Sequence, residues 1–105
     1  MHFINRIPAP LQVHCKSKDS DIGTHIQKNG QDLPWHFRRN LFDRTLFFCT
    51  CQWGARNKRF AVWDKRLEHY CKDAVGTDYT CFWEARTDGF YISNDKVHWT
   101  KINSW

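Results

Sequence analysis

The chain has 105 residues, a formal net charge of +5 at pH 7, and an aromatic content of six Trp, eight Phe and three Tyr. A chain of this length can bury one core of useful size, so we expect a single domain over residues 1–105. Its apolar runs are much shorter than the ~18 residues of a membrane-spanning helix, so we expect no membrane insertion.

The first third of the chain predicts two strands and two turns. His2–Ile7 is expected to form a strand that ends at Pro8–Pro10, because proline cannot donate a hydrogen bond to a β-ladder. A second strand is expected over Leu11–Lys18, where apolar and polar residues alternate. The polar stretch Asp19–Gly23 then predicts a bend, and Asn29–Gly30 predicts a hairpin turn.

The middle of the chain predicts three more strands and one long connection. Leu33–Arg38 alternates and contains a proline that favours an edge position. Thr45–Trp53 is the most strand-like run in the sequence. The basic stretch Gly54–Arg59 is expected to turn the chain into a fifth strand, Phe60–Trp63. Asp64–Asp78 follows as the longest connection, in which a helical turn is an option.

The last quarter of the chain predicts a three-stranded meander. Its strands are Tyr79–Arg86, Phe90–Ser93 and Val97–Ile102, and the turns between them are Thr87–Gly89 and Asn94–Lys96. Eight short strands at this spacing predict an all-β fold, a small antiparallel β-sandwich of two packed sheets.

The chain contains five cysteines. In so short a sequence, and without the spacing of a zinc site, they indicate disulfides formed outside the cytosol. Cys49 and Cys51 flank Thr50 on one strand face and are too close to bridge each other comfortably, so one of the two is expected to stay free. We assign the free thiol to Cys51. The chain begins without the charged and apolar segments of an export signal, so we expect a mature, secreted form.

Residues that could support catalysis or bind a metal are scattered. None of the six histidines forms the i, i+4 pair of a helical metal site. Cys49, Cys51, His69 and Cys71 could together supply four zinc ligands, but structural zinc favours Cys pairs with two to four residues between them. A secreted ribonuclease is the enzyme alternative for a basic chain, yet no two histidines are singled out as an acid–base pair. We expect no catalytic residues, no metal and no cofactor.

The carboxylates have a simpler explanation than acid–base chemistry, because side chains of this kind commonly form turns or face solvent. Those expected in such positions are Asp19, Asp21, Asp64, Glu68, Glu84 and Asp88.

The densest basic cluster is Arg56, Lys58 and Arg59, beside Asn57. Such charges most simply keep a β-protein soluble, although basic loops also attract an acidic receptor. Aromatic residues near basic ones, such as Trp53 near Arg56, could stack nucleic-acid bases. Because these aromatics alternate in phase with the inward strand faces, we expect core packing and no nucleic-acid partner.

Several segments, in this order along the chain, resemble the plant self-incompatibility S-protein homologues. They are Leu11–Gly23, Trp35–Phe37, Thr45–Cys49 with Trp53, Cys71, Cys81–Trp83 and Gly89–Tyr91. The resemblance implies a small secreted plant protein with a β-sandwich fold and two disulfides. It also implies that some members trigger rejection of self pollen through a pollen membrane receptor, and it supplies no catalytic residues.

The family pattern also bears on the cysteines. Cys15, Cys49, Cys71 and Cys81 match its bridging positions, while Cys51 falls where an apolar residue is common. Three connectivities are open for four cysteines. We favour Cys15 with Cys81 and Cys49 with Cys71.

These observations lead us to expect a secreted, monomeric, non-enzymatic ligand that binds a cell-surface receptor through its loops. A role in self-incompatibility or related cell–cell signalling would follow. The alternative is a defence or toxin-like protein that acts on membranes. The residues expected to contact the partner are Arg56, Asn57, Lys58 and Arg59, with Asp19, Ser20, Asp21 and the Lys65–Asp78 connection as further candidates.

Overall fold

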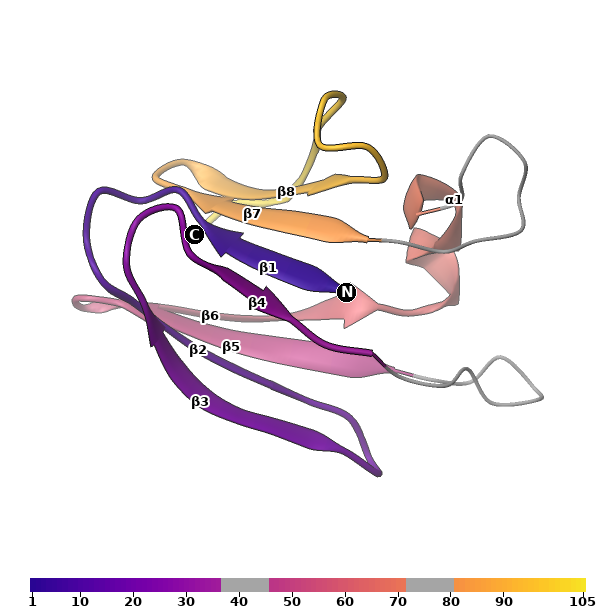
Figure 1. The fold of residues 1–105 in the computed structure, drawn as a ribbon, viewed down its shortest axis with the longest axis horizontal. Coiled ribbons are helices and arrows are strands. Elements are labelled where there is room, and N and C mark those ends of the chain that lie inside the picture. The colour runs from indigo at the N-terminus through magenta and orange to yellow at the C-terminus, as the bar shows by residue number, and fades with distance from the viewer. Residues whose placement is uncertain (37–45, 72–80) are drawn as a thin grey trace.

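The computed structural model describes residues 1–36, 46–71 and 81–105. Within these residues, nine strands form two β-sheets that pack face to face (Figure 1). Sheet A has the order β4-β1-β7-β8-β9, with bounds Asp32–Pro34, His2–Asn5, Phe82–Arg86, Gly89–Ser93 and Thr100–Asn103. Sheet B has the order β3-β2-β5-β6, with bounds Asp21–Gln27, Leu11–Lys16, Phe47–Trp53 and Arg56–Trp63. The predicted all-β sandwich is confirmed.

Neighbouring strands are antiparallel, with the exception of β1 and β7, which run parallel in the centre of sheet A. A short 3-10 helix, η1 (Lys65–Leu67), leads into the single-turn helix α1 (Glu68–Cys71). Figure 1 shows α1 at one end of the sandwich and the turn between β5 and β6 at the other.

Alternation along the strands builds the core between the sheets. Leu11, Val13 and Cys15 are fully buried on β2, as their spacing predicts. Phe60 of sheet B joins the two layers, because its ring centre lies 5.2 Å from that of Trp83 and 4.4 Å from that of Phe90, both in sheet A. Aromatic side chains therefore hold the sheets together.

The Trp83 indole also connects the two sheets through a hydrogen bond. Its Nε1–H donates a hydrogen bond of 2.9 Å to the carbonyl of Val62, on the opposite sheet. Val62 has no register partner on β5, because Phe47 pairs with Trp63 while Phe48 pairs with Ala61. This β-bulge turns both Val62 and Trp63 inward and leaves a carbonyl available to the indole.

Strand β3 is the main element that the sequence analysis missed. The expected bend over Asp19–Gly23 is limited to the residues before Asp21, and β3 then runs beside β2 as an edge strand. Its faces are only partly covered, so its side chains lack the clear alternation of a half-buried strand. Gly23 has φ +86°, a conformation that few other residues adopt, near the register shift in the β2–β3 ladder.

The bounds of two other strands also differ from the predicted ones. The last predicted strand begins only at Thr100, because Asp95 organises the residues before it into a turn, as described below. The third predicted strand is reduced to the three residues of β4 before Trp35. The last two residues of the predicted strand Leu33–Arg38 lie outside the described residues. So do the first residue of the predicted strand Thr45–Trp53, the end of the long connection from Lys72, and the first two residues of the predicted strand Tyr79–Arg86.

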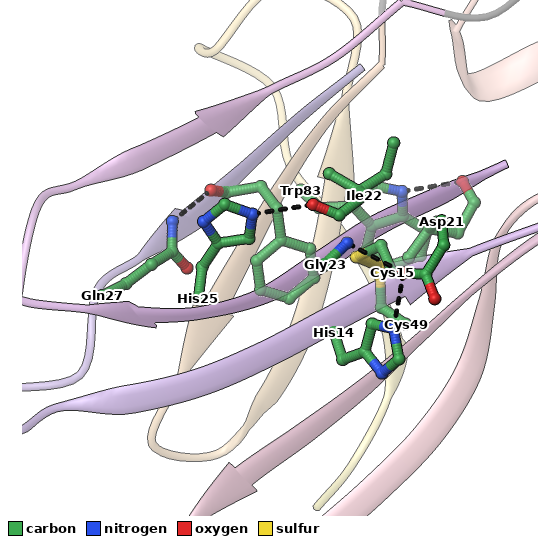
Figure 2. Close-up of a disulfide and its surroundings, with 11 residues drawn as sticks. His14, Cys15, Asp21, Ile22, Gly23, His25, Gln27, Cys49 and Trp83 are labelled. Atoms are coloured by element: carbon green, nitrogen blue, oxygen red, sulfur yellow. Dashed lines mark hydrogen bonds and ion pairs between the residues drawn. A yellow bond between two sulfur atoms is a disulfide. The ribbon is translucent and has the colours of Figure 1, made fainter.

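The cysteine pairing that we favoured was wrong. The structure joins Cys15 to Cys49 and Cys71 to Cys81. Cys15 and Cys49 are register partners on the neighbouring strands β2 and β5, so their thiols meet within sheet B. Cys81 directly precedes β7 in sheet A, and its Cα atom lies 4.8 Å from that of Cys71 at the end of α1. Figure 2 shows the Cys15–Cys49 disulfide and its surroundings.

Cys51 carries the free thiol and is fully buried on β5. Its register partners are Val13 on β2 and Lys58 on β6. Burial raises the pKa of the Cys51 thiol far above its usual value, because the thiolate would lose its solvation. The neutral thiol behaves as a small apolar core residue.

Candidate functional site

The basic residues that the sequence analysis placed in a turn lie on a strand. The turn itself is reduced to Gly54 and Ala55, and Arg56–Arg59 form the first half of β6. The expectation of a basic loop was therefore wrong. Gly54, with φ +57°, supports the tight two-residue turn that connects β5 to β6. Strand β6 forms one edge of sheet B.

The strand divides these residues between two faces. Asn57 and Arg59 pair with Gln52 and Thr50 on the outer face of sheet B. Arg56 and Lys58 alternate with them and therefore project from the inner side, at the rim of the sandwich. The four residues consequently form a basic edge that is accessible from both faces of the sheet.

Aromatic rings support two of the cations on this edge. The Arg59 guanidinium carbon lies 4.9 Å from the centre of the Phe48 ring. The Arg56 guanidinium carbon lies 5.1 Å from the centre of the Trp53 ring, which itself packs against Trp105. Contacts of this kind attract a cation without neutralising its charge.

The charges on β6 lack acidic partners among the described residues. No described carboxylate lies within 4.0 Å of the charged nitrogens of Arg56, Lys58 or Arg59. Elsewhere in the described chain, Arg6 and Arg86 pair with carboxylate oxygens at 3.2 and 3.0 Å. We define Arg56–Arg59 as the basic edge. It is a local concentration of positive charge on a rigid strand.

The predicted acidic candidates do not join the basic edge. Asp19 and Ser20 lie in the turn between β2 and β3, and Asp21 opens β3. Two strands separate β3 from β6, which corresponds to roughly 14 Å across sheet B. In Figure 1 this turn lies at the opposite end of the sheet from the turn before β6. The structure thus separates the predicted residues into two regions.

Asp21 has a structural role in its own turn. Its Oδ1 accepts hydrogen bonds from the Gly23 backbone at 2.8 Å and from the His14 ring at 2.7 Å (Figure 2). The Gly23 hydrogen bond, followed by the His14 contact, lowers the pKa of the Asp21 carboxyl. Ser20 donates its backbone N–H to the Ser17 hydroxyl. These contacts explain Asp21 and Ser20 as parts of the β2–β3 turn.

The connection proposed as a further candidate is described only from Lys65 to Cys71. Asp64 caps η1, since its Oδ1 accepts the Leu67 backbone N–H at 3.1 Å. Its other oxygen pairs with Arg66 at 3.0 Å. The basic residue Arg66 is therefore partly neutralised, unlike those of the basic edge.

Glu84 was wrongly expected on an exposed surface. It points to the outer face of sheet A but is buried, because Arg6 and Arg86 cover its two oxygens. Arg86 in turn lies 3.9 Å above the Tyr91 ring. The Glu84-x-Arg86 spacing could have suggested this contact, because both residues share a strand face. The contact with Arg6, 78 residues away, arises only from the parallel pairing of β1 with β7.

The loop between β8 and β9 is held by one carboxylate. Asp95 accepts hydrogen bonds from the Ser93 hydroxyl at 2.9 Å and from the backbone N–H groups of Val97 and His98 at 2.8 Å. The His98 ring also contacts it at 2.7 Å. The Ser93 hydroxyl thus bonds to Asp95 rather than to His98, so these three residues lack the Ser–His contact of a nucleophilic triad.

In the described part of the chain, the remaining polar groups form no metal-binding cluster. Among the described residues, no three His, Cys, Asp or Glu side chains are arranged to hold a metal ion. His2 pairs with Asp32 at 2.6 Å, and its ring stacks on that of Phe82. No helix in the described ranges has the length and apolar character needed to cross a bilayer. The basic edge is therefore the strongest candidate for contact with another molecule.

The chain is similar to a family of plant proteins. Over residues 1–105 it matches the family described as "Plant self-incompatibility protein S1". It is 40% identical over 81 residues to S-protein homolog 5 of Arabidopsis thaliana, which covers 76% of this chain and 58% of that protein. It is 34% identical over 98 residues to S-protein homolog 24 of the same plant, with coverages of 90% and 61%.

A further relative is the self-incompatibility protein S1 of Papaver rhoeas. The identity is 30% over 81 residues, which covers 77% of this chain and 56% of that protein. The chain spans little more than half the length of these curated relatives. No solved structure matches it significantly.

Proposed function

The chain belongs to the plant self-incompatibility protein S1 family, and we propose that it is a secreted, non-enzymatic recognition protein that binds a receptor protein on the plant cell surface. Its role would be in self-incompatibility or related cell–cell signalling, and the Papaver rhoeas relative is named a self-incompatibility protein. The proposal differs from our initial expectation in one respect, because the contact surface is a strand edge and not a basic loop.

The observation that carries the proposal is the basic edge. Three cations, Arg56, Lys58 and Arg59, lie together without a carboxylate from the described residues beside them. Uncompensated charge of one sign attracts a partner of the opposite sign and raises its association rate. The β-ladder with β5 fixes the edge, so little order has to be gained on binding.

The cysteines support the proposed location. Two disulfides in a domain of this size are typical of proteins that mature in an oxidising compartment.

Binding to living cells tests the proposal. Fluorescently labelled protein should bind plant protoplasts saturably, and mild protease treatment of the protoplasts should abolish binding. Charge reversal of the basic edge, R56E/K58E/R59E, should lower the affinity at least about tenfold, because attraction becomes repulsion. The variant Lys28→Glu is the control, since Lys28 is an exposed cation that follows β3, at the opposite edge of sheet B.

Two other outcomes would redirect the assignment. Dye release from protein-free liposomes at physiological salt would indicate the membrane-active alternative. Degradation of RNA by the purified protein would show that it is a nuclease. Binding that survives both protease treatment and charge reversal would overturn the proposed receptor contact.

A further inference from the structure

Strand β6 lies at the edge of sheet B. It is an eight-residue edge strand whose ladder partner is β5. Among the described residues, its backbone groups make no backbone hydrogen bond to any strand other than β5. In an antiparallel ladder, every second residue directs its N–H and C=O away from the partner strand. In the first half of β6, Arg56–Arg59, the outer side therefore presents donors and acceptors that no described residue pairs.

The available part of the edge coincides with the positive charge. In the second half of the strand, the Val62 carbonyl already accepts the Trp83 indole, and Val62 and Trp63 are buried. The first half is the basic edge, Arg56–Arg59, whose residues are exposed or partly exposed. Outward-facing backbone groups of alternate residues and three uncompensated cations thus occur within the same four-residue segment.

Charged residues on edge strands commonly prevent aggregation, which is an alternative explanation for the cations of β6. The cations of the basic edge would repel a second copy of β6, because self-pairing would place positive charges opposite positive charges. The same cations would attract a strand that carries carboxylates. Protection from self-pairing and selection of an acidic strand are therefore two results of one charge pattern.

We propose that the basic edge accepts an extended acidic segment of a partner protein as an added β-strand. This inference rests on the proposed function, because the partner is taken to be the receptor protein proposed there. Arg56–Arg59 spans about 13 Å, enough for about four residues of an added strand. Asn57 and Arg59 face one side of the sheet, and Arg56 and Lys58 face the other. Carboxylates on either face of the added strand would therefore meet a cation.

The test uses the folded protein and a synthetic acidic peptide of about eight residues that combines Glu with the strand-forming residues Thr and Val. NMR titration should shift the backbone amides of Arg56–Arg59 and reveal cross-strand contacts between the peptide and β6. A peptide of the same sequence with N-methylated internal amides keeps its charge but cannot donate to the ladder. It should bind at least about tenfold more weakly.

Charge is tested separately from the backbone. The matching peptide with Gln in place of Glu should also bind at least about tenfold more weakly, as should the acidic peptide to K58E/R59E. Lys28→Glu should leave peptide binding unchanged, because Lys28 follows β3, at the opposite edge of sheet B. Circular dichroism and the amide spectrum check that each variant is folded.

Several results would overturn strand addition. Equal binding of the N-methylated peptide would show attraction by charge alone. Shifts confined to other strands would place the contact elsewhere, and a concentration-dependent β6–β6 dimer would identify a second copy as the occupant. Peptide binding to β6 without protoplast binding would support this inference while the proposed function fails. Protoplast binding without any response of β6 to the peptide would overturn the inference alone.

Discussion

Cys15 and Cys49 are directly opposite each other on the neighbouring strands β2 and β5, with Cα atoms 4.0 Å apart, and a disulfide joins them. The bridge lies within sheet B and links residues 34 apart in the sequence. The second bridge, between Cys71 and Cys81, links residues only 10 apart and fastens α1 to the start of β7.

The two bridges should contribute differently to stability. In the chain-entropy description, a bridge stabilises by restricting the unfolded chain, and the effect grows with loop length. We expect C15A/C49A to lower the free energy of unfolding by roughly 4 kcal/mol and C71A/C81A by roughly 3 kcal/mol. Urea unfolding of both double variants measures this difference. A larger loss from C71A/C81A would contradict the loop-length argument.

Cys51 should be unreactive in the folded protein. Its thiol is fully buried and burial raises its pKa, so a thiol reagent at neutral pH should label it only after unfolding. Replacement by Ser should cost about 1–3 kcal/mol of unfolding free energy, because the new hydroxyl would lack a partner in an apolar site. Cys51→Ala removes the sulfur without adding a polar group and is the control. Rapid labelling under native conditions would show that the site opens.

Glu84 should matter for stability, because it is buried on the outer face of sheet A beneath two arginines. Glu84→Gln would leave the guanidinium groups of Arg6 and Arg86 without the carboxylate that they share. Because Arg6 is half exposed, solvent reduces the effect, and we expect a loss of about 1–2 kcal/mol. A double-mutant cycle with Arg86→Ala measures the coupling. Additive losses would show that the pair does not interact energetically.

Stability should fall in acid partly through Asp95. The His98 ring, followed by the backbone N–H groups of His98 and Val97, holds the pKa of this carboxyl below its ordinary value of 3.8. Because the folded pKa is the lower one, the stabilisation is complete above pH 3.8 and is lost as the pH falls through the folded pKa. Asp95→Asn should therefore be less stable than the unmodified protein at pH 6, with a difference that shrinks in acid.

The control for this measurement is Asp19→Asn, which changes an exposed carboxylate in the β2–β3 turn. Its effect should vary less with pH. A loss in Asp95→Asn that is the same at pH 6 and in acid would show that the charge of Asp95 is not the cause.

Substitution of Gly89 should destabilise the protein, because the neighbouring strand lies close to it. It has φ +154°, and a Cβ atom there would collide with the backbone carbonyl oxygen of Asn103 on β9. We expect Gly89→Ala to cost about 1–3 kcal/mol of unfolding free energy. Gly54→Ala is the matched control: Gly54 also has a positive φ, +57°, but its Cβ would meet open space, so this variant should lose less stability. If the two variants lose the same stability, steric contact with Asn103 is not responsible.

Local patterns predicted much of the fold. Period-two alternation identified β2, β5 and β7 and the inward direction of Cys15 and Trp83, because these strands have one face against the core. It failed for β3, whose edge position leaves both faces partly exposed. It also misplaced the basic residues, since charges on an exposed edge strand resemble those of a turn.

The sequence by itself determined the fold class and the clustering of positive charge near residue 57, because alternation and composition depend only on neighbours along the chain. Only the tertiary structure decided the disulfide pairing, the burial of Glu84 between two arginines, and the conversion of a basic stretch into an edge. The physical reason is that each depends on strand order and register, which bring together residues tens of positions apart.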